Sequence, residues 1–306
     1  MPTRRHVVAG LSLSALGFGA ASLSRPALAA ASSTLQARTI PSSGQAVPVI
    51  GMGTADSFNV GEADADRAPL REVMRRFFAA GATVIDTAPS YGRSEAVVGD
   101  LLAELQLRER AFLCTKLGAS GREAGLAQFE QSLRRLRTDK VELLQVHNLV
   151  DWKTQLGLIN ELKAQGRTRY SGLTHYTEGG QDALADAVQA MKPDFLQINY
   201  SVISTGAERR LFPMARDLGV AVMINRAFDD GRLFRQAAGK PLPDWAAEAG
   251  ISSWAQAFLR FALSHPAVTV VIPATGRPDR QSDNLQAGVG PALTAGQRKS
   301  LQALFA

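Results

Sequence analysis

The sequence predicts an α/β fold, a (β/α)8 TIM barrel with a small N-terminal β-hairpin, on three observations. Strand-like and helix-like segments alternate strictly from about residue 49 to residue 272. The strand-like segments are short, continuous hydrophobic runs, which is typical of parallel strands covered on both faces. Eight such strands within roughly 250 residues match the size of a (β/α)8 barrel.

The expected elements begin with the hairpin. Two extended segments, 38–41 and 47–50, flank the polar run 42–45, whose glycine favours a tight turn. The first barrel strand is expected at 49–52. The seven other strands are expected at 83–85, 112–114, 141–146, 170–173, 195–198, 220–224 and 268–272.

Helical signals separate these strands. Apolar residues recur at helical spacing from Leu70 to Phe78, and Gly81 ends that helix, which is expected at 69–80. The other helices are expected at 94–105, around 126–136, up to Gly166, and at 182–191, 207–218 and 254–263. The longest stretch without periodicity, 225–250, is long enough to form a functional loop over the barrel mouth.

Two other architectures compete with the single barrel. Its 306 residues also suit two ordinary domains, but the unbroken alternation favours one barrel over residues 37–306. An open doubly wound sheet is the closer competitor. No Gly-x-Gly-x-x-Gly turn follows an early strand, so the usual fingerprint of that fold is missing.

The first 29 residues have the pattern of a cleavable signal. Arg4-Arg5 precedes an uncharged run rich in Ala, Gly, Leu and Ser, which ends in Ala27-Leu28-Ala29. Paired arginines favour the twin-arginine export route, and a Sec signal is the alternative. The run is short and glycine-rich for a membrane anchor. We therefore expect the twin-arginine translocon as partner during export, no stable membrane anchor after cleavage, a linker at 30–36 and a periplasmic mature protein.

The composition narrows the possible partners. Removing residues 1–29 removes three arginines and no acidic residue, so the formal net charge falls from +6 to +3. The remaining basic residues are interleaved with acidic ones on helical segments. They therefore do not form the kind of basic patch that binds nucleic acid. The single cysteine, Cys114, cannot form an internal disulfide. It lies in an apolar strand and reads as a buried structural thiol, with a reactive thiol as the alternative.

Four polar residues lie at or just beyond the C-terminal ends of expected strands: Asp86, Tyr91, Lys116 and His147. In a parallel barrel these ends carry the chemistry. A tyrosine acts as an acid near neutral pH when a cation stabilises its phenolate, and Lys116 is the candidate cation. Asp86 can pair with Lys116, and a neutral His147 can bond a carbonyl oxygen. Together the four side chains predict carbonyl reduction.

Each of the four also has a purely structural interpretation. Asp86 alone suits a turn, His147 a hydrogen-bonded strand end, Tyr91 a loop aromatic and Lys116 a solvated strand terminus. Their joint occurrence at the ends of strands two, three and four favours catalysis.

The chain resembles the aldo-keto reductase family over about residues 37–290. The resemblance rests on segments 81–92, 132–147 and 166–175, and on Ile272-Pro273 leading to Asn284. It implies a (β/α)8 barrel that binds a nicotinamide dinucleotide, usually NADPH, without a Rossmann domain. It also implies that Tyr91 is the general acid, assisted by Lys116, that Asp86 pairs with Lys116, and that His147 orients the carbonyl.

The resemblance implies a cofactor site that departs from the family pattern. Thr174 and Gln197 match residues that bond the nicotinamide carboxamide, whereas His175 stands where asparagine is usual. Asn225 replaces an aromatic residue that stacks on the nicotinamide. Arg226 follows it and is expected to reach the pyrophosphate or to cover the edge of the nicotinamide ring, with a solvent-facing loop arginine as the alternative. The resemblance further places Arg280 at the 2′-phosphate of NADP, against the alternative of ordinary solvation at a helix start, and Asn284 at the adenine.

The functional hypothesis is an NADP(H)-dependent reductase of a small aldehyde or ketone, with no metal site. Its rival is a catalytically slow barrel of the same family that senses nucleotide or binds a partner. The changes at His175 and Asn225, together with Ala274 where some members have lysine, favour the rival, and the complete set of four catalytic residues opposes it. A barrel hydrolase is a third possibility, for which no metal-ligand cluster or nucleophile elbow is visible.

Overall fold

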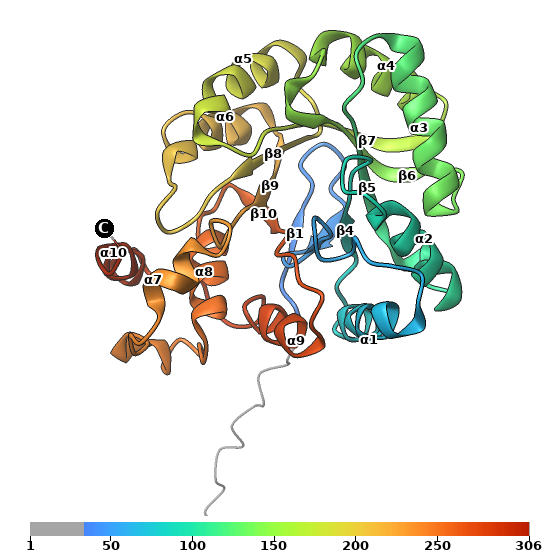
Figure 1. The fold of residues 1–306 in the computed structure, drawn as a ribbon. Coiled ribbons are helices and arrows are strands. Elements are labelled where there is room, and N and C mark those ends of the chain that lie inside the picture. The colour runs from blue at the N-terminus through green and yellow to red at the C-terminus, as the bar shows by residue number, and fades with distance from the viewer. Residues whose placement is uncertain (1–33, 306) are drawn as a thin grey trace, which may run out of the picture. The chain divides into compact units, whose positions relative to one another are not determined.

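A computed structural model describes residues 34–305, which form a closed (β/α)8 barrel (Figure 1). Eight parallel strands neighbour one another in chain order, from β3 (Met52–Gly53) to β10 (Val268–Val271). Parallel bridges from Ile50 to Val271 and from Gly53 to Ala274 close the sheet on itself. The fold class predicted from the sequence is confirmed. The predicted signal lies outside the described residues.

The other elements complete the alternation. The remaining barrel strands are β4 (Val84–Asp86), β5 (Phe112–Leu117), β6 (Val141–Val146), β7 (Thr168–Thr174), β8 (Phe195–Asn199) and β9 (Ala221–Asn225). The helices are α1 (Asp64–Ala79), α2 (Ser94–Glu104), α3 (Arg122–Leu136), α4 (Trp152–Ala164), α5 (Gln181–Met191), α6 (Leu211–Leu218), α7 (Arg232–Ala237), α8 (Trp254–Leu263), α9 (Pro278–Gln286) and α10 (Ala295–Ala303). Within residues 34–305, no helix is both long enough and apolar enough to span a bilayer.

Two helix starts differ from the prediction. α1 begins at Asp64, ahead of the expected start at Pro69, which lies inside the helix. The carboxylates of Asp64 and Asp66 in the first turn favour this earlier start, because they face the positive end of the helix dipole. α6 begins at Leu211, and a short 3-10 turn, Gly206–Glu208, replaces its expected first turn.

The hairpin closes the N-terminal end of the barrel. β1 (Ala37–Thr39) pairs antiparallel with β2 (Ala46–Pro48), and Gly44 adopts the left-handed conformation that the turn requires. Ile40 and Val47 join the apolar cluster inside the barrel. The hydroxyl of Tyr170 anchors the turn, since it donates to Gln45 Oε1 at 2.8 Å.

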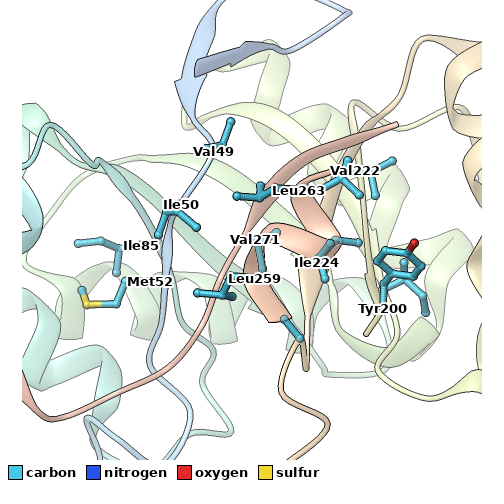
Figure 2. Close-up of a cluster of buried hydrophobic side chains, with 14 of the residues drawn as sticks. Val49, Ile50, Met52, Ile85, Tyr200, Val222, Ile224, Leu259, Leu263 and Val271 are labelled. Atoms are coloured by element: carbon cyan, nitrogen blue, oxygen red, sulfur yellow. The ribbon is translucent and has the colours of Figure 1, made fainter. Parts of the chain in front are cut away.

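Two apolar layers hold the barrel together, one on each side of the sheet. On β9, Val222 and Ile224 point outward, and Figure 2 shows them in the cluster that includes Leu259 of α8. Met223, between them on the strand, points into the barrel interior. Because successive strand residues face opposite sides, continuous apolar runs supply both layers.

Candidate active site

A cavity of about 650 Å³ lies among the loops that follow the C-terminal ends of the strands. Seven of the residues proposed from the sequence line it, and they come from five strands or the loops after them. These are Asp86, Tyr91, His147, Thr174, Gln197, Asn225 and Arg226. The structure therefore brings most of the candidate residues together at the end of the barrel where catalysis is expected.

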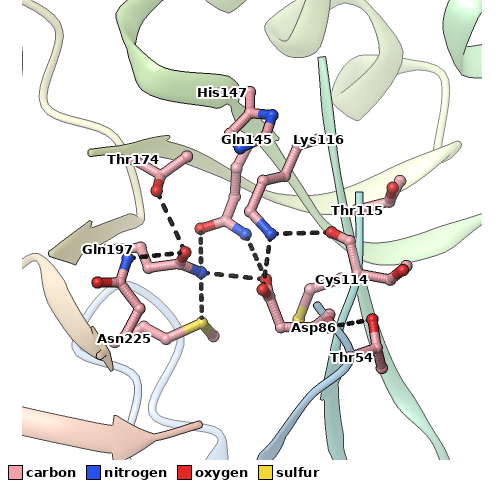
Figure 3. Close-up of polar contacts among 12 residues, drawn as sticks. Thr54, Asp86, Cys114, Thr115, Lys116, Gln145, His147, Thr174, Gln197 and Asn225 are labelled. Carbon is pink, nitrogen blue, oxygen red and sulfur yellow. Dashed lines mark hydrogen bonds and ion pairs between the residues drawn. The ribbon is translucent and has the colours of Figure 1, made fainter. Parts of the chain in front are cut away.

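A buried ion pair lies at the base of this cavity (Figure 3). Lys116 Nζ donates to Asp86 Oδ2 at 2.6 Å and to the backbone oxygen of Thr87 at 2.8 Å. Lys116 is fully buried and Asp86 is 2 % exposed. Burial alone would lower the pKa of Lys116, but the charge of Asp86 and the nearby Tyr91 reverse this effect and raise it. Lys116 is therefore an ammonium ion.

The ammonium lies against Tyr91. Lys116 Nζ is 5.1 Å from the centre of the Tyr91 ring. The ring of His147 packs edge-to-face on Tyr91, with centroids 5.9 Å apart and planes at 85°. Tyr91 thus lies between a positive charge and an imidazole, and its ring forms part of the cavity wall.

His147 is held in its neutral form. Burial, helped by the positive charge of Lys116, lowers the pKa of His147 to about 4. Ser90 Oγ lies 3.4 Å from His147 Nδ1. A neutral imidazole carries one N–H, so His147 can donate a hydrogen bond to an oxygen in the cavity without adding a charge.

A chain of side-chain amides continues from Asp86 along the cavity wall (Figure 3). Gln197 Nε2 donates to Asp86 Oδ1 at 3.0 Å. Gln197 Oε1 accepts from Thr174 Oγ1 and from Asn225 Nδ2, both at 3.2 Å. Asn225 Nδ2 also donates to the backbone oxygen of His175 at 3.1 Å. The charge on Asp86 therefore sets the orientation of every amide in this wall.

His175 and Arg226 make other contacts than the sequence suggested. The His175 ring lies away from the cavity lining, where its Nδ1 accepts from the Thr177 backbone N–H at 3.3 Å. Arg226 lines the cavity but is paired with Asp230, and it donates to the backbone oxygen of Tyr176 at 3.1 Å. Arg226 therefore joins the loops after β7 and β9 at the cavity mouth.

Arg280 and Asn284 lie on one helix near the cavity and do not form part of the cavity wall. Both belong to α9, which begins at Pro278, shortly after cavity-lining Pro273 and Ala274. Arg280 is exposed, whereas Asn284 is 3 % exposed. Residues four apart share one helix face, so the two side chains can serve a single ligand there.

Several lining residues were not singled out from the sequence. Loop residues need tertiary structure to be placed, but one buried residue carries a sequence signal. Gln145 lies two residues before His147 on the same strand, and strand periodicity places such residues on one face. The lining residues concerned are Thr54, Ser90, Asn148 and Tyr176, and Gln145 lies behind the lining, where it donates to Asp86.

The arrangement can deliver a proton to an oxygen held in the cavity. The Tyr91 hydroxyl can supply the proton, the Lys116 ammonium is placed to stabilise the charge left behind, and neutral His147 can hold the oxygen. Within residues 34–305, no group of three or more His, Cys, Asp or Glu side chains could hold a metal ion.

Comparison with known proteins agrees with this geometry. The model of the aldo/keto reductase family matches residues 49–305. Methylglyoxal reductase YeaE of Escherichia coli (strain K12) is 29 % identical over 246 residues, which cover 78 % of this chain and 84 % of that protein. An aldo/keto reductase of Klebsiella pneumoniae solved with NADP and acetate is 26 % identical, with a TM-score of 0.72, covering 86 % of this chain and 93 % of its own.

A second structure described as an aldo-keto reductase of Klebsiella pneumoniae, in complex with NADPH, is 25 % identical with a TM-score of 0.73. It covers 89 % of this chain and 95 % of its own. The family match spans most of the chain, from the first barrel strand to α10. The chain therefore belongs to the aldo/keto reductase family of oxidoreductases.

Proposed function

We propose that this protein is an NADP(H)-dependent reductase of aldehydes or ketones. The observation that carries the proposal is the placement of Tyr91 between the Lys116 ammonium and the neutral His147 ring, in the wall of the cavity. An acid beside a fixed positive charge, with an uncharged donor opposite, suits protonation of a carbonyl oxygen.

The amide wall fits a nicotinamide group. Thr174, Gln197 and Asn225 present a hydroxyl and two amides beside Tyr91. Asn225 Oδ1 has no hydrogen-bond partner in the described part of the chain, and an amide N–H of a ligand is the kind of group that satisfies such an oxygen. We assign the nicotinamide carboxamide to this wall.

The phosphate end of the nucleotide is assigned to α9 and to the loop after β9. Arg280 in the first turn of α9 offers a guanidinium to the 2′-phosphate, and the helix N-terminus favours negative charge. Asn284, one turn further, is placed at the adenine. Arg226 at the cavity mouth is placed near the pyrophosphate, where it would exchange its bond to Asp230 for a phosphate oxygen.

Reduction then uses the protein for positioning and proton transfer. The bound nucleotide supplies the hydride to the carbonyl carbon. His147 donates a hydrogen bond to the carbonyl oxygen and orients it toward Tyr91. Tyr91 gives its hydroxyl proton to that oxygen as the alcohol forms, and Lys116 stabilises the phenolate until solvent returns a proton.

Replacing Tyr91 by phenylalanine tests the proposal. Wild type should oxidise NADPH with members of a panel of small aldehydes, and Tyr91→Phe should lose about 10²–10⁴-fold in kcat, the range of a general acid. Nucleotide affinity, measured by fluorescence titration, should stay within a few fold. Tyr176→Phe is the matched control, because it removes an exposed hydroxyl from the same cavity and should retain most of the turnover.

The alternative is a nucleotide-sensing or partner-binding barrel. It draws support from the two positions that depart from the expected contacts, His175 outside the cavity lining and Arg226 held by Asp230. If wild type and Tyr91→Phe both bind NADPH and neither oxidises it above background, the reductase proposal fails and the sensing role takes its place.

We also propose that residues 1–29 direct export of the protein through the twin-arginine route to the periplasm. The support is the sequence pattern of paired arginines, an apolar run and a small-residue cleavage site. That route carries folded proteins, so the nucleotide can be loaded before export.

A further inference from the structure

Gln145 is a buried amide that touches the ion pair but not the cavity. It is 0 % exposed, and it lies on β6 opposite Lys116 of β5. Its Nε2 donates to Asp86 Oδ1 at 3.0 Å (Figure 3). A carboxylate oxygen is only a hydrogen-bond acceptor, and in a side-chain amide only the NH2 group donates. The NH2 end of the Gln145 side chain must therefore face Asp86.

Gln145 completes the set of donors around Asp86. Oδ2 accepts from Lys116 at 2.6 Å, while Oδ1 accepts from Gln145 and from Gln197, each at 3.0 Å. Rotation of the carboxylate would break bonds on both oxygens. The two amides therefore fix the plane of Asp86, and Asp86 in turn fixes the position of the Lys116 ammonium below Tyr91.

The neighbouring strand makes room for Gln145. Gly172 of β7 pairs with Gln145 in the sheet register. A Cβ atom at Gly172 would lie 2.7 Å from Gln145 Cγ, closer than real atoms approach, and 3.3 Å from Leu143 Cδ1. The side chain of Gln145 can cross to Asp86 because residue 172 is glycine.

We propose that Gln145 is a positioning residue for carbonyl reduction, which acts through Asp86 to hold Lys116 against Tyr91. The inference rests on the proposed function for its kinetic consequence. Its structural part, that Gln145 and Gly172 together control the Lys116 ammonium, does not depend on turnover.

The first test is Gln145→Leu, which keeps the volume and removes the donor. We expect kcat to fall about tenfold, the loss for one hydrogen bond to a charged group. KM and the dissociation constant for NADPH should change less than kcat, because Gln145 reaches the cavity wall only through Gln197, whose Nε2 donates to Gln145 Oε1 at a long 3.4 Å. The isotope effect with 4-deuterated NADPH should rise as the chemical step becomes limiting.

Gln155→Leu is the matched control. Gln155 of α4 is also 0 % exposed, donates to the backbone oxygen of Gly121 just before α3, and packs against a glycine of α3, Gly125. It makes no contact with the ion pair. An equal fall in kcat for Gln155→Leu would show that replacing any buried glutamine by leucine is enough to lower kcat. That result would overturn the positioning role of Gln145.

The second test reaches Gln145 without replacing it. Gly172→Ala should displace the Gln145 side chain and reproduce the fall in kcat. In a Gln145→Ala background the obstructed Cγ is gone, so Gly172→Ala should cause no further loss. Additive effects of the two substitutions would refute the proposed coupling.

An NMR measurement on the nucleotide-free protein separates this inference from the proposed function. The 15Nζ resonance of Lys116, slow to exchange because the group is buried, should shift in Gln145→Leu and in Gly172→Ala but not in Gln155→Leu. If wild type reduces no aldehyde, the proposed function fails while this readout still decides on Gln145. If Gln145→Leu leaves both the resonance and kcat unchanged, the inference is wrong. Should Gln145→Leu fail to fold by circular dichroism, Gly172→Ala alone supplies both readouts.

Discussion

The lowered pKa of His147 makes the stability of the folded protein depend on pH. In the unfolded chain a histidine titrates near 6.5, whereas burial lowers the pKa of His147 to about 4 in the fold. Between these values the unfolded chain binds a proton that the folded protein does not. Stability from this group is therefore fully present above pH 6.5 and is lost as the pH falls toward 4.

The size of the effect follows from the pKa difference. Each unit corresponds to about 1.4 kcal/mol, so a drop from 6.5 to about 4 amounts to about 3 kcal/mol of unfolding free energy. His175 and His265 contribute in the same direction, because burial lowers the pKa of each as well. The informative quantity is therefore the difference between wild type and a variant without His147.

Urea unfolding of wild type and His147→Gln at pH 7, 6, 5 and 4 measures this difference. The loss of unfolding free energy between pH 7 and 4 should be about 3 kcal/mol smaller in the variant. His175→Gln is the control, since a backbone hydrogen bond of Thr177 partly offsets the effect of burial on the pKa of His175 and should leave a smaller change. Parallel pH curves for wild type and His147→Gln would refute the reasoning.

Two further predictions concern the buried thiol of Cys114 and the N-terminal segment. Burial raises the pKa of the Cys114 thiol well above its usual value. Iodoacetamide at pH 8 should therefore label Cys114 in the denatured protein but not in the native protein. Rapid labelling of the native protein would contradict the interpretation of Cys114 as a buried structural thiol. Export predicts that mass spectrometry of periplasmic protein finds an N-terminus at Ala30, and an intact N-terminus on cytoplasmic protein would exclude it.

The sequence was sufficient to predict the barrel and the approach of the four candidate side chains, Asp86, Tyr91, Lys116 and His147. Helical spacing and apolar strands identified α8 with its observed bounds, Trp254–Leu263, and strand ends placed Asp86 and Lys116 near each other. These signals depend on local pattern and on a fold whose strand ends converge. Both are readable from the order of residues alone.

The details of the amide wall were not readable in this way. A match by position placed His175 toward the nicotinamide, yet its ring bonds to Thr177 and leaves the space beside Gln197 to Asn225. Which side chain fills that space depends on loop conformation after β7 and β9. Sequence spacing does not determine such loop conformations. For the same reason the sequence did not indicate that Arg226 forms an ion pair with Asp230.

Strand periodicity explains how a charged pair can survive inside the barrel. On several strands an inward apolar residue is followed two positions later by an inward polar one, so an apolar floor lies directly below a polar layer. The pairs are Val84 and Asp86, Cys114 and Lys116, Leu143 and Gln145, Phe195 and Gln197, and Met223 and Asn225.

Burying the Lys116–Asp86 pair over that floor costs desolvation energy, which a single ion contact does not recover. The amides of Gln145 and Gln197 recover part of this cost, because they supply the hydrogen bonds that water would otherwise make to Asp86 Oδ1. A polar layer assembled from adjacent strands can thus hold the ammonium in a dry site beside Tyr91. Replacing one of its amides should therefore weaken proton transfer before it weakens the fold.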